Sequence, residues 1–199
     1  MMEFKVDHYF QTPIYTSLKK EWIKKYNKLC DLHIKKDDQL THQSDSLVED
    51  NNFKELKDYI GINSWNILDH MGFDLSQYEL FFTELWVQEF ARSGGGHHEA
   101  HVHSNNHMSG FYFLKCSKRT SYPVFYDPRA GAMMSKLELK NESIAGVGSE
   151  KINLKPEPGT FIFFPPYLKH YFVLDQGKDP FRFIHFNIQA VRKEIVNHK

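Results

Sequence analysis

The sequence predicts a mainly β protein, an antiparallel sandwich or barrel with N-terminal helices packed against one outer face. Three observations support this prediction. Helical spacing of apolar residues is confined to the part before residue 79. After it, short aromatic and β-branched segments alternate with turn residues. The 199 residues are 41% hydrophobic, enough for one core without disulfides. We expect a single domain over 1–199, with helical support (1–78), a β-barrel core (79–190) and a C-terminal tail (191–199).

Two helices are expected in the N-terminal part. From Ser17 to about Ile34, apolar residues recur at helical spacing between lysines, and Ser17 is the expected N-cap. A polar loop follows over 35–51. Asn52-Phe-Lys-Glu55 then resembles a capping box that opens a second helix. Gly61 weakens this helix and is where a bend or a break would fall.

Seven strands are expected in the rest of the chain, because each segment is short, rich in aromatic or β-branched residues and bounded by Gly, Pro, Asn or Asp. They are 80–91, 107–116, 122–127, 150–155, 159–166, 170–175 and 181–190. The longest weakly patterned connection between them is 128–149. Long ordered loops of this kind are often lids or substrate-binding elements.

Charge and cysteine content restrict the partners and the compartment. Lys plus Arg and Asp plus Glu are 25 each, so no net charge attracts nucleic acid or a membrane surface, and neither partner is predicted. Cys30 and Cys116 lie in no C-x-x-C spacing, which favours a reducing compartment. The first residues lack the layout of a signal peptide. We therefore expect a cytoplasmic protein.

Five histidines fall within fourteen residues in the segment "HHEAHVHSNNHMSG", residues 97–110. In an extended strand, His101 and His103 point to the same side and present two imidazoles that can chelate a metal. On its own an H-x-H pair is weak evidence, since histidines in a loop are more often exposed to solvent than bound to metal.

His170 strengthens the metal hypothesis. It follows the apolar segment Phe161–Phe164 and Pro165-Pro166 at the head of another strand. A polar imidazole beside so apolar a strand requires a partner. A metal shared with His101 and His103 is one candidate, and a buried hydrogen bond to the backbone is the other.

Arg182 is expected close to that metal. Residues 175–179 have the composition of a hairpin turn, so simple antiparallel pairing places Arg182 roughly opposite His170. Its planar guanidinium suits a carboxylate held by two parallel hydrogen bonds. A salt bridge to a glutamate such as Glu84 is the alternative. His185 has the opposite parity, so it should point to the other face of the strand if the arginine points inward.

Several segments taken together resemble the Fe(II)- and 2-oxoglutarate-dependent oxygenases, especially a small branch found in bacteria and phages and similar to prolyl hydroxylases. These segments are W86-x-x-x-F90, "HVHSNNHMSGFYFLK", "FYDPR", "PEPGTFIFFPPYLKH" and "FRFIHFN" within about 80–190, and the early "QTPIY". The resemblance implies a double-stranded β-helix, a jelly-roll or cupin-like barrel, with Fe(II) at its open mouth. It also implies O2-dependent hydroxylation of a C–H bond, with 2-oxoglutarate converted to succinate and CO2. The substrate would be a small molecule or a peptide, such as a free or peptidyl amino acid.

The resemblance assigns a role to five residues. His101 is the first metal ligand, His103 occupies the position of the usual carboxylate ligand, and His170 is the distal histidine. Arg182 is the anchor for the far carboxylate of 2-oxoglutarate. Tyr112 is placed to support that carboxylate with its hydroxyl group.

His103 departs from the usual triad of two imidazoles and one carboxylate. Three neutral imidazoles also suit zinc, so the alternative function is a cupin-like metal-binding protein that holds a small anion without oxygenase activity. Another arrangement has His103 as the first ligand and Asp127 as the carboxylate. The H-x-H arrangement is preferred because a ligand two residues away needs no particular strand register. A third alternative is a structural sandwich whose histidines serve hydrogen bonds.

Four further residues are candidates for contacts with substrate or with the metal ligands. Asn105 and Ser109 are polar enough to orient either, although turn formation explains the asparagine equally well. Asp127 and Arg129 are candidates for substrate contact at the rim. The 128–149 loop is the candidate for a segment that closes over the substrate.

Overall fold

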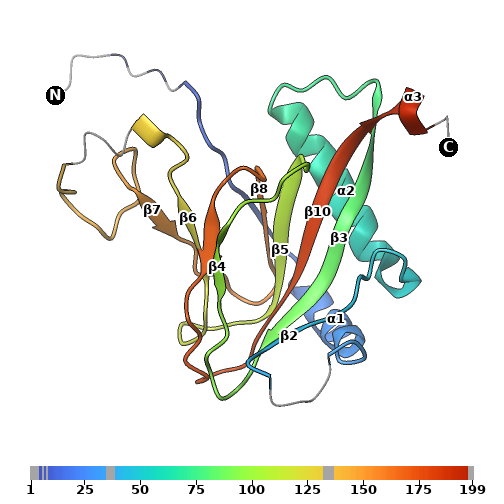
Figure 1. Ribbon diagram of the computed structural model, residues 1–199, viewed down its shortest axis with the longest axis vertical. Coiled ribbons are helices and arrows are strands. Elements are labelled where there is room, and N and C mark those ends of the chain that lie inside the picture. The colour runs from blue at the N-terminus through green and yellow to red at the C-terminus, as the bar shows by residue number, and fades with distance from the viewer. Residues whose placement is uncertain (1–4, 6, 8, 35–38, 132–136, 197–199) are drawn as a thin grey trace.

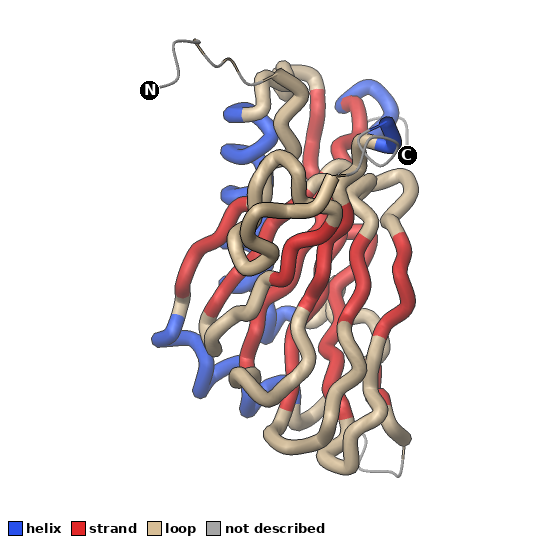
Figure 2. The backbone as a smooth tube through the Cα atoms, turned by 90° about the vertical axis from the view of Figure 1, so that its left-hand side faces the viewer, coloured by secondary structure: helices blue, strands red, loops and turns tan. Residues whose placement is uncertain are grey.

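The computed structural model describes residues 5, 7, 9–34, 39–131 and 137–196. Two antiparallel β-sheets face each other, and the helices cover the outer face of the larger sheet (Figure 1). Figure 2 shows the same layers from the side, with the long helix behind the strands. The predicted fold class, a double-stranded β-helix with helices on one outer face, is confirmed.

The larger sheet has six strands in the order β1-β8-β5-β10-β3-β2. Its long central pair runs from Phe181 opposite Phe90 to Arg192 opposite Tyr78. The strand bounds are β1 Tyr15–Leu18, β2 Thr41–Gln43, β3 Tyr78–Phe90, β5 Met108–Lys115, β8 Thr160–Phe164 and β10 Phe181–Arg192.

The smaller sheet has four strands in the order β4-β9-β6-β7. Within it, His101 pairs with His170, and Phe125 pairs with His170 from the other side. The strand bounds are β4 His98–His101, β6 Pro123–Tyr126, β7 Lys151–Asn153 and β9 His170–Phe172.

All seven predicted strands are present, but three short strands were not predicted. β1 and β2 come from the region expected to be only helix and loop. β4 carries His98 and His101. β1 covers the edge of β8, where Tyr15 lies opposite Phe163. No strand is described between Tyr126 and Lys151, in agreement with the long connection expected there.

The first helix is shorter than the sequence predicts. The second helix is continuous. A 3-10 turn, Lys20–Trp22, leads into α1, Ile23–Cys30, while Ser17 lies in β1 and its hydroxyl contacts the Tyr59 hydroxyl at 2.8 Å. Ser17 is therefore not an N-cap.

The second helix, α2, spans Lys54–His70 and passes through Gly61 without a break. It follows a 3-10 turn, Asn51–Phe53, that is capped by Asp50, whose carboxylate accepts from the Asn52 backbone N–H at 2.8 Å. The chain ends its described part in a short helix, α3, Lys193–Val196.

The alternation of side chains along the strands divides the core into two clusters. One cluster lies between the large sheet and the helices and includes Tyr26, Phe53, Tyr112 and Ile184. The other cluster fills the space between the two sheets. Its buried members are Phe90, Phe111, Phe113, Cys116, Phe125, Ile162, Phe164, Leu168, Phe172, Phe181 and Phe183.

Both cysteines are buried and unpaired. None of the helices in the described part of the chain combines the length and the apolar character needed to cross a bilayer.

Candidate metal centre

His101, His103 and His170 come together at one end of the smaller sheet. One ring nitrogen from each lies within 4.8 Å of the others. The ring centroids are 4.5 Å apart for His101 and His170, 4.9 Å for His101 and His103, and 5.2 Å for His103 and His170. The sequence thus predicted correctly that these three residues, distant along the chain, lie side by side.

Hydrogen bonds to the backbone fix the orientation of two of these rings. Nδ1 of His170 lies 2.9 Å from the Leu168 carbonyl oxygen, and Nδ1 of His101 lies 2.6 Å from the Glu99 carbonyl oxygen. Because a carbonyl oxygen only accepts, each Nδ1 must donate its proton. The lone pair of each neutral ring is then on Nε2, the nitrogen available to a metal.

Burial keeps the imidazoles of His103 and His170 neutral. Desolvation lowers the pKa of His103 to about 3 and the pKa of His170 to about 2. His98, which is not in the three-histidine group, has its pKa lowered to about 4 for the same reason. Neutral imidazoles are the form that binds a metal.

The buried nitrogens fit a metal ion. Nε2 of His103 and Nε2 of His170 are inaccessible to solvent and have no hydrogen-bond partner. An unsatisfied buried polar atom costs about 1–3 kcal/mol. A divalent cation bound to both nitrogens would remove that cost, and three imidazole nitrogens are a ligand set suited to iron or zinc.

A buried polar network lies beside His103 and includes the predicted Ser109. The Asn187 side chain on β10 contacts Nδ1 of His103 at 3.0 Å and donates to Glu84 at 2.9 Å. Ser109 donates to Asn187 at 2.5 Å. Ser109 is therefore linked to His103 only through Asn187. Asn187 was not predicted, although its parity on the strand matches that of His185.

His185 and Glu84 adjoin this network and were not expected at the site. The His185 ring is buried and stacks on His103, with ring centroids 4.8 Å apart. Its Nε2 lies 3.3 Å from Oε2 of Glu84 on β3. His185 and Arg182 lie on opposite faces of the strand, as their parity predicts, but the inward residue is His185 and not Arg182 as expected.

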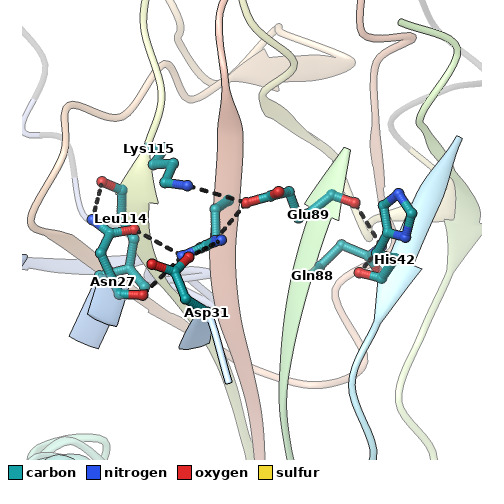
Figure 3. Close-up of polar contacts among 8 residues, drawn as sticks. Asn27, Asp31, His42, Gln88, Glu89, Leu114 and Lys115 are labelled. Carbon is teal, nitrogen blue, oxygen red and sulfur yellow. Dashed lines mark hydrogen bonds and ion pairs between the residues drawn. The ribbon is translucent and has the colours of Figure 1, made fainter. Parts of the chain in front are cut away.

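The expected position of Arg182 is wrong. Its guanidinium lies on the face of β10 that packs against α1, where Nε donates to Glu89 at 2.6 Å and Nη2 donates to Asp31 at 2.7 Å. Nη1 also donates to the Asn27 backbone carbonyl at 3.0 Å. Figure 3 shows Asn27, Asp31 and Glu89 around this group, with Lys115 contributing a further ion pair to Glu89.

The pairing expected to bring Arg182 to His170 does not occur. β9 pairs with β4 and β6 in the smaller sheet, whereas β10 pairs with β3 and β5 in the larger one. The turn over 175–179 therefore crosses between sheets rather than closing a hairpin. Periodicity shows that Arg182 and His185 face opposite ways, but it does not show which of the two faces of β10 points between the sheets.

Tyr112 is also on the helix side. It is buried against Tyr26 and Phe161, and its hydroxyl donates to the Lys19 carbonyl oxygen at 2.8 Å. It does not point toward the histidines. Among the described lysines and arginines only Arg182 is buried. Because Arg182 and Tyr112 both bond on the helix side of the large sheet, neither expected anchor for the far carboxylate of 2-oxoglutarate faces the metal centre.

Asp127 is outside the group of possible metal ligands in the described structure. Its carboxylate pairs with Arg129, with a shortest distance of 2.6 Å, and that guanidinium holds the pKa of Asp127 below its ordinary value. Both residues line a groove of about 570 Å³ together with Val147 of the long connection. Asn105 is exposed in a left-handed conformation, with φ of 59°, as expected for a turn.

One phenylalanine is shared by this groove and the surroundings of the buried histidine. The Phe125 ring lines the groove, and its centroid is 5.6 Å from that of His170. The ring centroids of Phe164 and Phe111 are 4.8 and 5.7 Å from that of His170. Three phenylalanine rings thus pack around His170, and one of them reaches the groove.

Comparison with known proteins supports the interpretation of this centre. The model of a family described as "Putative 2OG-Fe(II) oxygenase" matches residues 84–187, slightly more than half of the chain. That stretch includes all three histidines of the centre as well as Glu84 and Asn187. No curated protein matches the chain.

Solved structures of similar fold include a prolyl-4-hydroxylase and a protein crystallised with 2-oxoglutarate. EvdO2 from Micromonospora carbonacea var. aurantiaca superimposes with a TM-score of 0.62 at 9% identity, covering 95% of this chain and 94% of that one. A prolyl-4-hydroxylase from Pseudomonas putida gives 0.57 at 7%, covering 89% and 93%. HygX from Streptomyces hygroscopicus, solved with nickel, 2-oxoglutarate and hygromycin B, gives 0.57 at 8%, covering 89% and 83%.

Proposed function

Because the chain belongs to the 2OG-Fe(II) oxygenase family, we propose that it hydroxylates a C–H bond of its substrate and releases succinate and CO2. The cofactors of this family are Fe(II), 2-oxoglutarate and O2. The observation that supports the proposal is the convergence of three imidazoles, from β4, the turn after it and β9, on one point at the barrel mouth.

We assign the metal ligands as His101, His103 and His170. When bound, iron and the keto acid supply the oxidising chemistry, and the protein supplies binding, orientation and exclusion of water. The Nδ1–H groups of His101 and His170 are held by backbone carbonyls, so both rings keep Nε2 directed to one point. The Asn187 amide nitrogen lies 3.0 Å from Nδ1 of His103. Binding of a metal by Nε2 of His103 requires the proton on Nδ1, with the Asn187 amide turned so that its oxygen accepts from this nitrogen.

The aromatic residues around His170 have a protective role in this proposal. Phe111, Phe125 and Phe164 surround the ring and keep water from the buried side of the centre. Arg182 and Tyr112 have no part in the proposed site, because their polar groups are bonded on the opposite face of the large sheet. The groups that hold the far carboxylate of 2-oxoglutarate are therefore other residues.

We assign the substrate to the groove beside Phe125, where Asp127 and Arg129 lie at the rim. The groove has room for a small molecule or for the side chain of a peptide, and Val147 places the long connection at its edge. Of the fold neighbours, HygX was solved with hygromycin B bound, and the protein from Pseudomonas putida is named a prolyl-4-hydroxylase. A free or peptidyl amino acid is the class of substrate that we propose.

Succinate formation without added substrate tests the chemistry and does not require the substrate to be known. We expect slow, Fe(II)-dependent conversion of 2-oxoglutarate to succinate, and a weak visible charge-transfer band when both are added without oxygen. His170→Ala should abolish the conversion, whereas Arg119→Ala, an exposed residue paired with Asp179, should leave it unchanged. Tight retention of zinc with neither band nor succinate would instead favour the cupin-like metal-binding protein.

A further inference from the structure

We propose that the barrel mouth contains a second position for a divalent cation, formed by Glu84, His103 and His185 and adjoining the first position through the shared His103. One ligand atom from each of these three residues lies within 4.8 Å of the other two. The set contains two imidazoles and one carboxylate, whereas the first position has three imidazoles.

The buried histidine of the second set has unsatisfied nitrogens. His185 is 1% exposed, and neither of its ring nitrogens has a hydrogen-bond partner. Nε2 of His103 is unsatisfied as well. Unsatisfied nitrogens on two rings that stack with centroids 4.8 Å apart are what a site for a shared cation would require.

The carboxylate of the set is reachable from solvent. The Glu84 side chain is about half exposed, so a hydrated ion can reach it before it meets the buried ring. A carboxylate offsets part of the charge of a divalent cation, whereas the first position contains imidazoles only.

A simple ion pair between Glu84 and His185 does not account for the arrangement. Their nitrogen and oxygen are 3.3 Å apart without hydrogen-bond geometry, so the contact does not satisfy the buried ring. The carboxylate already accepts from Asn187.

The two positions compete for one imidazole. A single ring nitrogen of His103 coordinates one cation at a time, so the wild-type protein should bind one cation per chain. The second position becomes measurable when the first is disabled by a substitution that leaves His103 and His185 in place.

Binding of Co(II) alone, followed by equilibrium dialysis and by visible absorption, tests the proposal without any enzymatic readout. His170→Ala should still bind one Co(II) per chain, with an absorption spectrum different from that of the wild type. Adding Glu84→Gln or His185→Phe to this variant should weaken binding by tenfold or more, in the range seen when one group of a metal site is lost. Adding His97→Ala, an exposed histidine outside both sets, should change nothing.

Two results would overturn the second position. One is the absence of Co(II) binding in a folded His170→Ala variant. The other is equal affinity in His170→Ala with and without Glu84→Gln. If His170→Ala does not fold, His101→Ala disables the first position by removing a partly exposed ring and gives the same readout. A failure of succinate formation leaves these outcomes unaffected, because they measure metal binding alone.

Discussion

Nε of Arg182 lies 2.6 Å from Oε2 of Glu89, on the face of the large sheet that packs against α1. The arginine is 2% exposed, and its three nitrogens contact Glu89, Asn27 and Asp31. The group joins β10, β3 and the end of α1 across the sheet. Its place in the molecule is therefore structural, between the barrel and the helix that supports it.

Arg182→Ala should destabilise the protein without affecting the metal centre. Asp31 is largely exposed and Glu89 keeps its ion pair with Lys115, so the cost comes mainly from the lost buried hydrogen bonds and is about 1–3 kcal/mol. Urea unfolding would measure the loss, with Arg119→Ala as the exposed control that changes little. Co(II) affinity in native conditions should match the wild type. A stable variant with weakened 2-oxoglutarate binding would contradict this assignment and restore the arginine as the anchor.

Asn187→Ala should weaken metal binding more than Ser109→Ala. Asn187 contacts both His103 and Glu84, whereas Ser109 contacts only the asparagine. Groups that orient a metal ligand typically contribute about 10–100-fold in affinity. Chelator competition with bound Co(II) would rank the variants. Equal effects of the two substitutions would show that the network does not act through His103.

The metal-free protein should lose stability as the pH falls below about 6.5. The folded-state pKa of His170 is about 2, against an ordinary value of 6.5, so only the unfolded chain takes up a proton between these values. A fully buried group of this kind contributes up to about 1.4 kcal/mol per pH unit. The free energy of unfolding should thus be flat above pH 6.5 and fall below it, as His98 and His103 add to the trend.

Urea titrations of the metal-free protein at several pH values from about 7 to about 5 would check this dependence. Replacing His98 with Gln should reduce the slope, because one neutral buried ring is then absent from the folded state. A free energy of unfolding that does not change over this range would show that the histidines titrate normally in the folded protein.

Gly110→Ala should unfold the protein or destabilise it severely. A Cβ atom at this position would collide with the Phe186 ring and with the backbone carbonyl of Ile162 on β8. Gly61→Ala is the matched control, because a Cβ there meets nothing within 4 Å and the residue lies inside α2. Alanine is better than glycine in a helix by up to about 1 kcal/mol. Thermal unfolding should therefore shift down for one variant and slightly up for the other.

The strands and the three histidines could be predicted because each depends on local patterns. Aromatic and β-branched segments between turn residues predicted every strand from β3 onward except β4, and the spacing of His101 and His103 indicated a shared direction. The short strands β1 and β2 could not be found in this way. Three or four residues show too little alternation, and their pairing with β8 and β3 is set by tertiary contacts.

The errors at Arg182 and Tyr112 have a common origin. Along a strand the sequence shows which residues share a face, but both faces of the large sheet are buried, one under the helices and one under the smaller sheet. Hydrophobicity therefore does not identify the interior. Arg182 is the more polar candidate for an inward position, yet partners on α1 and β3 hold it on the other side.

The four-residue strand β1 has a consequence for handling the protein. It lies along β8, whose other neighbour is β5, so it protects an edge formed by Phe161, Ile162, Phe163 and Phe164. Truncation past Leu18 would uncover a row of unpaired amides beside phenylalanine side chains, a template for strand addition between molecules. Shortened versions of the chain should therefore keep Tyr15–Leu18 if they are to remain dispersed at high concentration.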